Sequence, residues 1–420
     1  RRSSDLIMMN ILRRFSMNLL IDGIKKDLVI ETDMTRKLTI GGHTDVYKVY
    51  KIDIDCLFFN DKNDRIATWI SQYKADNNIS ELDMSDIVKY NSIIQEFIEK
   101  SNQEAIKKTQ NNIELVDQRE PGVVLLDGRV IDGNRRFTCL RNLAKKNQRF
   151  RFFEAVILEK DLINNAKQIK MLELMIQHGE ESKVDYNPID KLAGIYNDII
   201  DKELITNKEY AQSTNNNLAE VNKQIEISKL LVEFLEFINA PKQFYIARDL
   251  ELNGPLHELY RILNNARDNN QKEDIKTVAF TNFLVQPHGD MTRFIRKINT
   301  VAKSKYLNEY LEEQIEFAEE ILDKLPEEGR VNKKVISDIF RSDEKSRENL
   351  KRSLEKAEMK AKATETRNRP LQILEKTCDS IESIDVNIFS KLSEEQLSSI
   401  KAQIDLLEEK INELKGFLDV

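Results

Sequence analysis

The residues best suited to binding chemistry lie in one short turn, Asp132-Gly133-Asn134-Arg135-Arg136. A glycine at a strand-to-helix turn lets backbone amides approach a ligand, and the free N–H groups and the dipole of the following helix favour an anion. Arg135 and Arg136 would add guanidinium donors that suit phosphate oxygens. Residues 133–136 are therefore a candidate phosphate site, in which Asp132 would orient an arginine or hold a metal. An ordinary capped helix with solvated arginines is the alternative.

A hairpin and a helix are expected to position this turn. Residues 123–126 and 129–131 have the composition of strands, and Asp127-Gly128 between them predicts a type I′ turn, which needs a positive φ at both residues. Asn134 is a favourable N-cap for the helix that follows. That helix has one apolar face, formed by Phe137, Leu140, Leu143 and Ala144.

Strand-like segments surround this hairpin, and helices dominate the rest of the chain. Residues 28–30, 38–40 and 46–54 are β-branched or alternating, with Gly41-Gly42 as a turn, and residues 152–158 form a further strand. Residues 66–108 have helical spacing, and strands nearly vanish after residue 160. Helix starts are expected at Asn187-Pro188, Thr206 and Ser393. The predicted fold is an α+β N-terminal domain followed by mainly α-helical domains.

The composition agrees with a helical protein and limits its function. Only 12 glycines and 7 prolines occur in 420 residues, which is far below the usual ~7% and ~5% and argues against a loop-rich β-sandwich. The net charge is −7, whereas non-specific polyanion binders are usually basic, so any nucleic-acid surface must be local. Cys56, Cys139 and Cys378 fit no CxxC spacing, which favours a reducing compartment and argues against a structural zinc site.

The candidate turn and its flanks resemble a known signature. The segment Val-Ile-Asp-Gly-Asn-Arg-Arg-Phe-Thr-Cys-Leu at residues 130–140, after a Val-Val-Leu-Leu strand, is similar to the ParB/sulfiredoxin superfamily. Upstream, residues 47–59 followed by Asn-Asp-Arg-Ile at residues 63–66 resemble that domain's first strand and its arginine motif. The similarity covers residues 45–185, with a helical insertion near residues 68–108, and Asn134 stands where the family has a small residue or Glu.

The resemblance implies a nucleotide-binding domain. By it, the domain would bind CTP or ATP with Mg²⁺, and the candidate nucleotide-binding residues would be Arg65, Asp132, Gly133, Asn134, Arg135, Arg136, His178 and Lys183. His178 and Lys183 precede Asn187-Pro188, which is similar to the family's junction with a DNA-binding helical domain. Sulfiredoxin chemistry requires a cysteine just before the arginine of the turn. This chain has none there, and Cys139 is expected to be a buried structural residue, so a sulfiredoxin-type reductase is rejected.

A helix-turn-helix is predicted near residues 206–234. Thr206 can cap a short helix, residues 215–217 are all Asn and suit a tight turn, and a second helix begins near Leu218 with Val221 and Ile225 facing inward. The start of the second helix would enter the major groove of DNA. Its reading face would comprise Asn217, Glu220, Asn222, Lys223 and Gln224, whose side chains can pair with bases or phosphates. The alternative is a helical hairpin inside a bundle.

The C-terminal segment has a coiled-coil pattern. A seam at 3-4 spacing comprises Leu397, Ile400, Ile404, Leu407, Ile411, Leu414 and Leu418, and Ser393 with Gln396 forms a capping box before it. A shorter stripe comprises Leu371, Leu374, Cys378 and Ile381. The two stripes could form an intramolecular hairpin, or residues 393–420 could form a homodimer, which the resemblance favours.

These patterns lead to one functional expectation with two alternatives. The expected segments are a tail or leader at 1–16, the α+β domain at 17–185, a helical domain at 186–300, a charged helical region at 301–369 and a C-terminal hairpin or coiled coil at 370–420. We expect a cytoplasmic, nucleoid-associated DNA-binding protein that is controlled by nucleotide, without a membrane span. Some superfamily members are nucleases or ATPases of mobile-element or phage-defence systems, and a plain transcriptional regulator with a degenerate nucleotide site is the other alternative.

Overall fold

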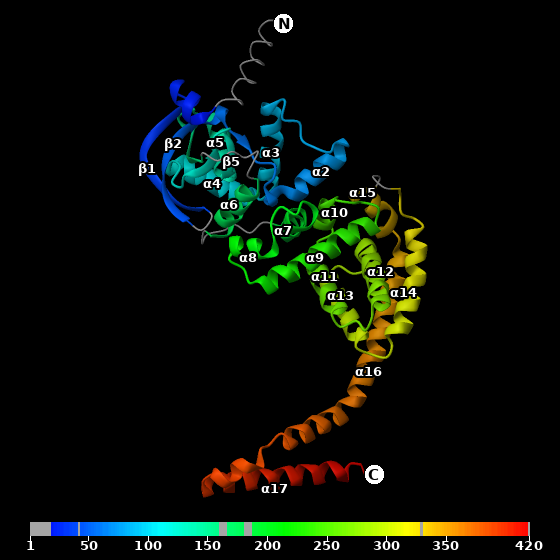
Figure 1. Ribbon diagram of the computed structural model, residues 1–420. Helices are drawn as coiled ribbons and strands as arrows, with labels where there is room; N and C mark the ends of the chain where they lie inside the picture. Colours follow the sequence, from blue (N-terminus) through cyan, green and yellow to red (C-terminus); the bar gives the residue numbers. More distant parts are fainter. Residues whose placement is uncertain (1–17, 41–42, 159–165, 180–186, 328–330, 419–420) are drawn as a thin grey trace. The chain divides into compact units, whose positions relative to one another are not determined.

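The computed structural model describes residues 18–40, 43–158, 166–179, 187–327 and 331–418 (Figure 1). The chain divides into two compact units, residues 1–358 and residues 359–420. The expected tail at residues 1–16 and the Gly41-Gly42 turn lie outside the described residues.

Six strands of the first unit form one mixed sheet in the order β1-β2-β6-β4-β5-β3. β3 pairs parallel with β5 and β4 pairs parallel with β6, while the other neighbours are antiparallel. The two short strands predicted at 28–30 and 38–40 belong to one strand, β1, whose register with β2 shifts between Glu31 and Thr35. The bounds are β1 (Val29–Ile40), β2 (His43–Asp53), β3 (Phe58–Phe59), β4 (Gly122–Leu125), β5 (Arg129–Asp132) and β6 (Phe152–Leu158).

Helices cover both faces of this sheet. Val124 and Phe137 belong to a core cluster on one face, whereas Val123 and Leu172 belong to the cluster on the other. Because successive strand residues point to opposite faces, neighbouring residues of β4 can serve both clusters. The helices of this region are α2 (Ala67–Asn77), α3 (Ile87–Ser101), α4 (Gln103–Val116), α5 (Asn134–Ala144) and α6 (Ala166–Gly179), with the short η1 (Leu19–Gly23), η2 (Ile54–Cys56), η3 (Asp64–Ile66) and η4 (Gln148–Phe150).

The turn between β4 and β5 differs from the predicted type I′ turn. Gly128 has a φ of 91°, but Asp127 is not among the residues with positive φ. The Gly128 N–H donates to the Leu125 carbonyl at 2.9 Å, so the loop contains three residues and ends in a left-handed glycine. A Cβ on Gly128 would lie 2.2 Å from the Cys56 carbonyl oxygen, so this close approach requires glycine.

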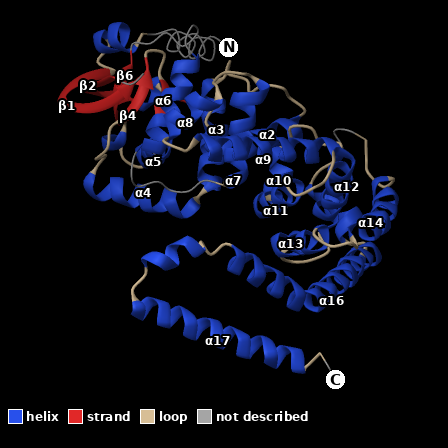
Figure 2. Cartoon of the chain, turned by 60° about the horizontal axis from the view of Figure 1, so that its bottom comes forward, coloured by secondary structure: helices blue, strands red, loops and turns tan. Residues whose placement is uncertain are grey.

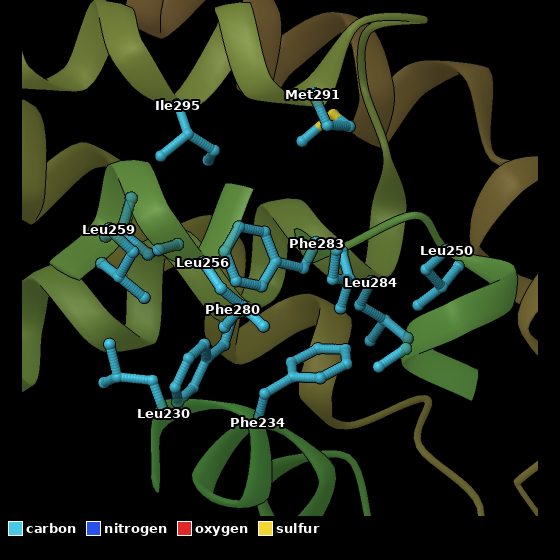
Figure 3. Packing of buried hydrophobic residues seen from close by; sticks show 14 of the residues in the cluster. Leu230, Phe234, Leu250, Leu256, Leu259, Phe280, Phe283, Leu284, Met291 and Ile295 are labelled. Atoms are coloured by element: carbon cyan, nitrogen blue, oxygen red, sulfur yellow. The ribbon is translucent and has the colours of Figure 1, made fainter. Parts of the chain in front are cut away.

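Helices alone build the rest of the first unit, as Figure 2 shows with strands confined to the N-terminal part. Phe234 of α9 packs edge-on against Phe280 and Phe283 of α12, with 5.7 Å between ring centroids in each pair (Figure 3). The chain is therefore an α+β domain followed by a long, mainly helical region, as predicted. The elements are α7 (Pro188–Ile195), η5 (Tyr196–Asp201), α8 (Asn207–Thr214), α9 (Leu218–Phe237), α10 (Phe244–Asp249), α11 (Asn253–Leu263), α12 (Asn269–Val285), α13 (Met291–Ala302), α14 (Leu307–Leu322), α15 (Lys333–Ile336), η6 (Ser337–Arg341) and the long α16 (Glu344–Glu382).

Pro370 does not end a helix, contrary to the predicted boundary at this point. It lies inside α16, where a proline removes only one backbone donor and the flanking Lys, Glu and Arg residues favour helix. The second unit continues with η7 (Val386–Lys391) and α17 (Glu394–Gly416), which Ser393 and Gln396 start with the predicted capping box. Among the described helices, none is long and apolar enough to cross a membrane.

Candidate functional site

The start of α5 depends on Gly133 rather than on the predicted cap residue. Gly133 is the N-cap, with a left-handed φ of 93°, and Asn134 is already the first helical residue. A Cβ on Gly133 would lie 2.9 Å from the ring of Phe153 and 3.2 Å from a guanidinium nitrogen of Arg136. The prediction that Asn134 caps the helix is therefore wrong, because the bend from β5 into α5 requires a conformation that glycine adopts readily.

Asp132 holds two arginines beside this turn. Its Oδ2 accepts a hydrogen bond from Arg136 at 3.0 Å and another from Arg36 of β1 at 3.1 Å. Arg36 also donates to the Pro121 carbonyl at 2.6 Å. Asp132 thus orients Arg136, which was one of its two expected roles. Arg136 is engaged in this ion pair, and no sequence pattern indicated the second partner, Arg36.

Arg135 has a different environment from its neighbour. Its guanidinium is half-buried and has no hydrogen bond or ion pair within the described part of the chain. Burial lowers the pKa of Arg135, and the nearby positive charge of Arg65 lowers it further, with a smaller effect of Arg136. The fold therefore brings Arg65 of η3 close to Arg135 of α5. A cluster of positive charges without a matching carboxylate for Arg135 is suited to an anionic ligand.

Two buried polar atoms lie on the same helix. Asn134 Oδ1 and Thr138 Oγ1 have no hydrogen-bond partner among the described residues, although both residues are less than a tenth exposed. Buried polar atoms are normally satisfied, so an unpaired atom at the first position of α5 is consistent with a polar ligand. These features fit a phosphate group held by Arg65, Arg135 and the start of α5.

Among its described residues, this region shows no metal site built from protein side chains. The Asp132 carboxylate, proposed as a possible ligand, already binds two arginines. No group of three or more His, Cys, Asp or Glu side chains within the described ranges is placed to hold a metal ion.

Cys139 is buried and unsuited to nucleophilic chemistry. Its side chain is fully inaccessible, and its Sγ lies 3.6 Å from the Ile106 carbonyl oxygen. Burial raises the pKa of the Cys139 thiol to about 12, so it stays protonated at neutral pH. The expectation of a buried structural cysteine is confirmed.

Two predicted ligand residues cannot be placed. His178 belongs to α6, but its side chain lies outside the described part of the structure, and Lys183 lies outside the described residues altogether. Their expected approach to a phosphate stays a prediction.

The helix pair α8–α9 has the local geometry predicted for a helix-turn-helix. Thr206 caps α8 with a capping box, Asn215 adopts the left-handed conformation with a φ of 52°, and Asn217 caps α9. Val221 and Ile225 are buried as expected. These local features match the prediction because capping and left-handed turns depend on residues that are close in sequence.

The proposed reading face lies at the exposed start of α9, where its polar groups bind one another. Lys223 Nζ lies 3.1 Å from Glu220, and Gln224 donates to the same carboxylate at 2.7 Å. Asn222 accepts from Asn207 of α8 at 2.9 Å, and the Asn217 side chain accepts from the Ala219 N–H. Glu220 therefore balances Lys223, so the start of α9 carries little net positive charge.

Beside Arg65 lies a buried charge cluster that the sequence did not predict. Lys170 of α6 lies 2.7 Å from Asp64, 2.9 Å from Asp198 of η5 and 3.8 Å from Glu173. Burial raises the pKa of Glu173 to about 8 and that of Asp198 to about 6. Asp64, Lys170 and Asp198 come from segments that are distant in sequence, so no local pattern could have revealed their pairing.

The segment that carries Arg65 is fixed to the helical region at further points. Gly194 of α7 packs so closely on Asp64 that a Cβ there would lie 2.5 Å from the Asp64 carboxyl carbon. Asp190 of α7 accepts a hydrogen bond from the Thr68 N–H at 2.7 Å. Arg248 of α10 donates to Thr68 and stacks over Trp69, with its guanidinium 4.1 Å from the ring centroid. The segment of the arginine motif is therefore packed against α7 and α10.

Comparison with known proteins adds no assignment. No model of a protein family matches this chain, and no curated protein matches its sequence.

Proposed function

We propose that this chain is a ParB-like DNA-binding protein whose α+β domain binds a nucleoside triphosphate, CTP or ATP, which controls how the protein engages DNA. The proposal depends on Arg135, a half-buried arginine at the start of α5. Its side chain lies near the positive charge of Arg65 of η3 and has no counter-charge among the described residues. A bound triphosphate would supply the negative charge that this position lacks. Arg135 would bind it directly, while Arg136 and Asp132 would hold the turn in shape.

The buried charge cluster offers a route from the nucleotide to the DNA-binding helices. Asp64 precedes Arg65 directly and is bound to Lys170 of α6. α6 packs extensively on α8, the first helix of the proposed helix-turn-helix. A shift of Arg65 toward phosphate would therefore act on α6 through Asp64 and on α8 through α6. Such a rigid connection is a physical means by which nucleotide could bias DNA engagement.

A nucleotide-binding panel tests the proposal. The full chain is titrated calorimetrically with CTP, ATP, GTP and UTP in Mg²⁺, with and without duplex DNA. We expect one triphosphate to bind, and Arg135→Ala to weaken it at least about tenfold because a charge-assisted hydrogen bond contributes roughly 1.5–3 kcal/mol. Arg119→Ala removes an exposed arginine of the same domain and is the matched control. Absence of binding for all four nucleotides would reject the proposal, and phosphate release during the same titrations would indicate a nucleotide-hydrolysing enzyme.

A further inference from the structure

One stretch of the helical region reverses the acidic balance of the chain. Residues 291–306 contain five basic residues and neither Asp nor Glu, although the whole chain has a net charge of −7. Most of these basic side chains are exposed, on α13 and just after it. They are Arg293, Arg296, Lys297, Lys303 and Lys305.

A buried carboxylate binds two exposed arginines at this surface. Oε1 of Glu258, on α11, accepts from Arg261 of the same helix at 3.1 Å and from Arg296 of α13 at 2.8 and 3.0 Å. The Glu258 side chain is 6% exposed, whereas Arg261 and Arg296 are 61% and 60% exposed. One buried negative charge thus fixes two guanidinium groups next to each other in solvent and leaves a net positive charge. Each guanidinium has five N–H donors, so donors remain for a further acceptor.

The helices that carry these arginines pack closely and in the same direction. Gly254 at the start of α11 contacts Thr292 at the start of α13, where a Cβ would lie 2.2 Å from the threonine Oγ1. One turn later, Glu258 binds Arg296. The two contacts progress in the same chain direction, so α11 and α13 run parallel. The exposed Arg293 and Arg296 therefore lie on α13 next to α11. The basic side chains therefore form a two-helix surface.

This surface adjoins the start of α9. α11 packs against α9 within the same core. Burial lowers the pKa of His257 on α11, Lys223 of α9 lowers it further, and Glu220 and Arg261 also act on it. His257 of α11 is therefore near Lys223 and Glu220 of α9 as well as near Arg261. The helix that carries Arg261 therefore lies near the start of α9.

We propose that Arg261, Arg293 and Arg296 bind the phosphate backbone of duplex DNA beside the groove that α9 enters. The inference rests on the proposed DNA-binding function and assigns to these arginines the backbone contacts that the nearly neutral start of α9 lacks. Guanidinium groups suit phosphate because their planar donors match two oxygens. Phosphate contacts of this kind position a protein on DNA, while neighbouring side chains read the bases. An acidic protein is the other partner that such a surface could accept, and the test below separates the two.

Salt-dependent DNA binding tests the assignment. The full chain is titrated against a fluorescein-labelled 40-base-pair duplex in fluorescence anisotropy, without nucleotide and with each triphosphate, over a series of KCl concentrations. Each phosphate contact contributes about 0.9 to the slope of log K against log salt. We expect the double variant Arg261→Gln/Arg296→Gln to lower that slope by about two and the affinity at least tenfold. Arg352→Gln is the control, since Arg352 is an exposed arginine that also binds a glutamate, Glu348 at 2.7 Å, on α16.

A second variant distinguishes lost phosphate contacts from a folding defect. The double variant leaves Glu258 buried without its partners, so Arg293→Gln, which leaves Glu258 and both of its arginines in place, is measured in parallel and should lower the slope by about one. DNA binding by both variants equal to that of Arg352→Gln overturns the inference. The inference is also overturned if the parent binds no duplex in any nucleotide state. Binding of an acidic protein through these arginines, in place of duplex, counts as this outcome. Calorimetric nucleotide binding needs no DNA, so failure of the nucleotide site is detected separately.

Discussion

Lys170 Nζ lies 2.7 Å from Oδ1 of Asp64, and this buried ion pair joins the segment of the arginine motif to helix α6. The lysine side chain is 5% exposed and that of Asp64 is 11% exposed. Asp198 and Glu173 are two further carboxyl groups within ion-pair distance of the lysine. The pair therefore links the proposed nucleotide site to the helical region at a place that water hardly reaches.

We predict that Lys170→Met strongly destabilises the protein. The substitution leaves several carboxyl groups buried without their cation, and breaking a buried pair in this way costs about 3–5 kcal/mol. Urea unfolding at pH 7.5 measures the loss, which should shrink at lower pH as Asp198 takes up a proton. Lys167→Met is the control, because Lys167 on the same helix forms an exposed pair with Glu209. Equal stability of the two variants would contradict the prediction.

Glu173 should make stability depend on pH in the neutral range. Burial raises the pKa of Glu173 from its usual 4.5 to about 8. Between these values the folded chain holds a proton that the unfolded chain has lost, so the free energy of unfolding falls as the pH rises from 4.5 through about 8. Glu173→Gln keeps a neutral group there and should flatten the dependence relative to the parent between pH 5 and 9. Parallel curves for the two proteins would show that Glu173 is ionised in the folded state.

Arg135 and Arg136 should contribute differently to nucleotide affinity and to the stability of the fold. Arg135 has no partner among the described residues, so Arg135→Ala should weaken nucleotide binding while the melting temperature stays close to that of the parent. Arg136 binds Asp132 at 3.0 Å, so Arg136→Ala should lower the melting temperature and weaken nucleotide binding through the altered turn. Calorimetric titration and thermal unfolding of both variants give the comparison. A loss of stability in Arg135→Ala with unchanged nucleotide affinity would reverse the assignment.

The start of α9 should contact DNA. Asn222→Ala and Lys223→Ala should each weaken duplex binding, and Lys223→Ala should also lower the salt slope by about one if its ammonium group meets a phosphate. Lys229→Ala is the matched control, since Lys229 pairs with Glu226 on the same helix just as Lys223 pairs with Glu220. Unaltered affinity in the Asn222→Ala/Lys223→Ala double variant would assign α8 and α9 to a structural hairpin.

The seam of α17 should make the protein a dimer. None of residues 394–416 is buried in the described chain, and Ile404 and Ile411 are exposed, so the seam has no cover within the described part of the second unit. An isolated amphipathic helix is marginal in water and gains stability by burying its apolar stripe. Ile404→Asp/Ile411→Asp should convert a dimeric parent into a monomer in light scattering. Leu406→Asp, an exposed position off the seam, should stay dimeric, and a monomeric parent at micromolar concentration would refute the idea.

Much of the local structure follows from the sequence because it depends on residues close together in the chain. Thr206, Asn215 and Asn217 predict the limits of α8 and α9, and Ser393 with Gln396 predicts the start of α17. Caps and left-handed turns are satisfied by side chains within a few residues, so their signal is local. The α+β class followed by helices could be predicted for the same reason.

The pairing of the functional groups depends on contacts between distant parts of the chain. Asp132 receives Arg36 from a distant strand, Lys170 gathers Asp64 and Asp198, and Glu258 joins Arg261 to Arg296. Neighbouring arginines such as Arg135 and Arg136 look equivalent in the sequence, yet one binds a carboxylate and the other does not within the described residues. Charge pairing and burial depend on chain segments that folding brings together from far apart, and no local spacing contains that information.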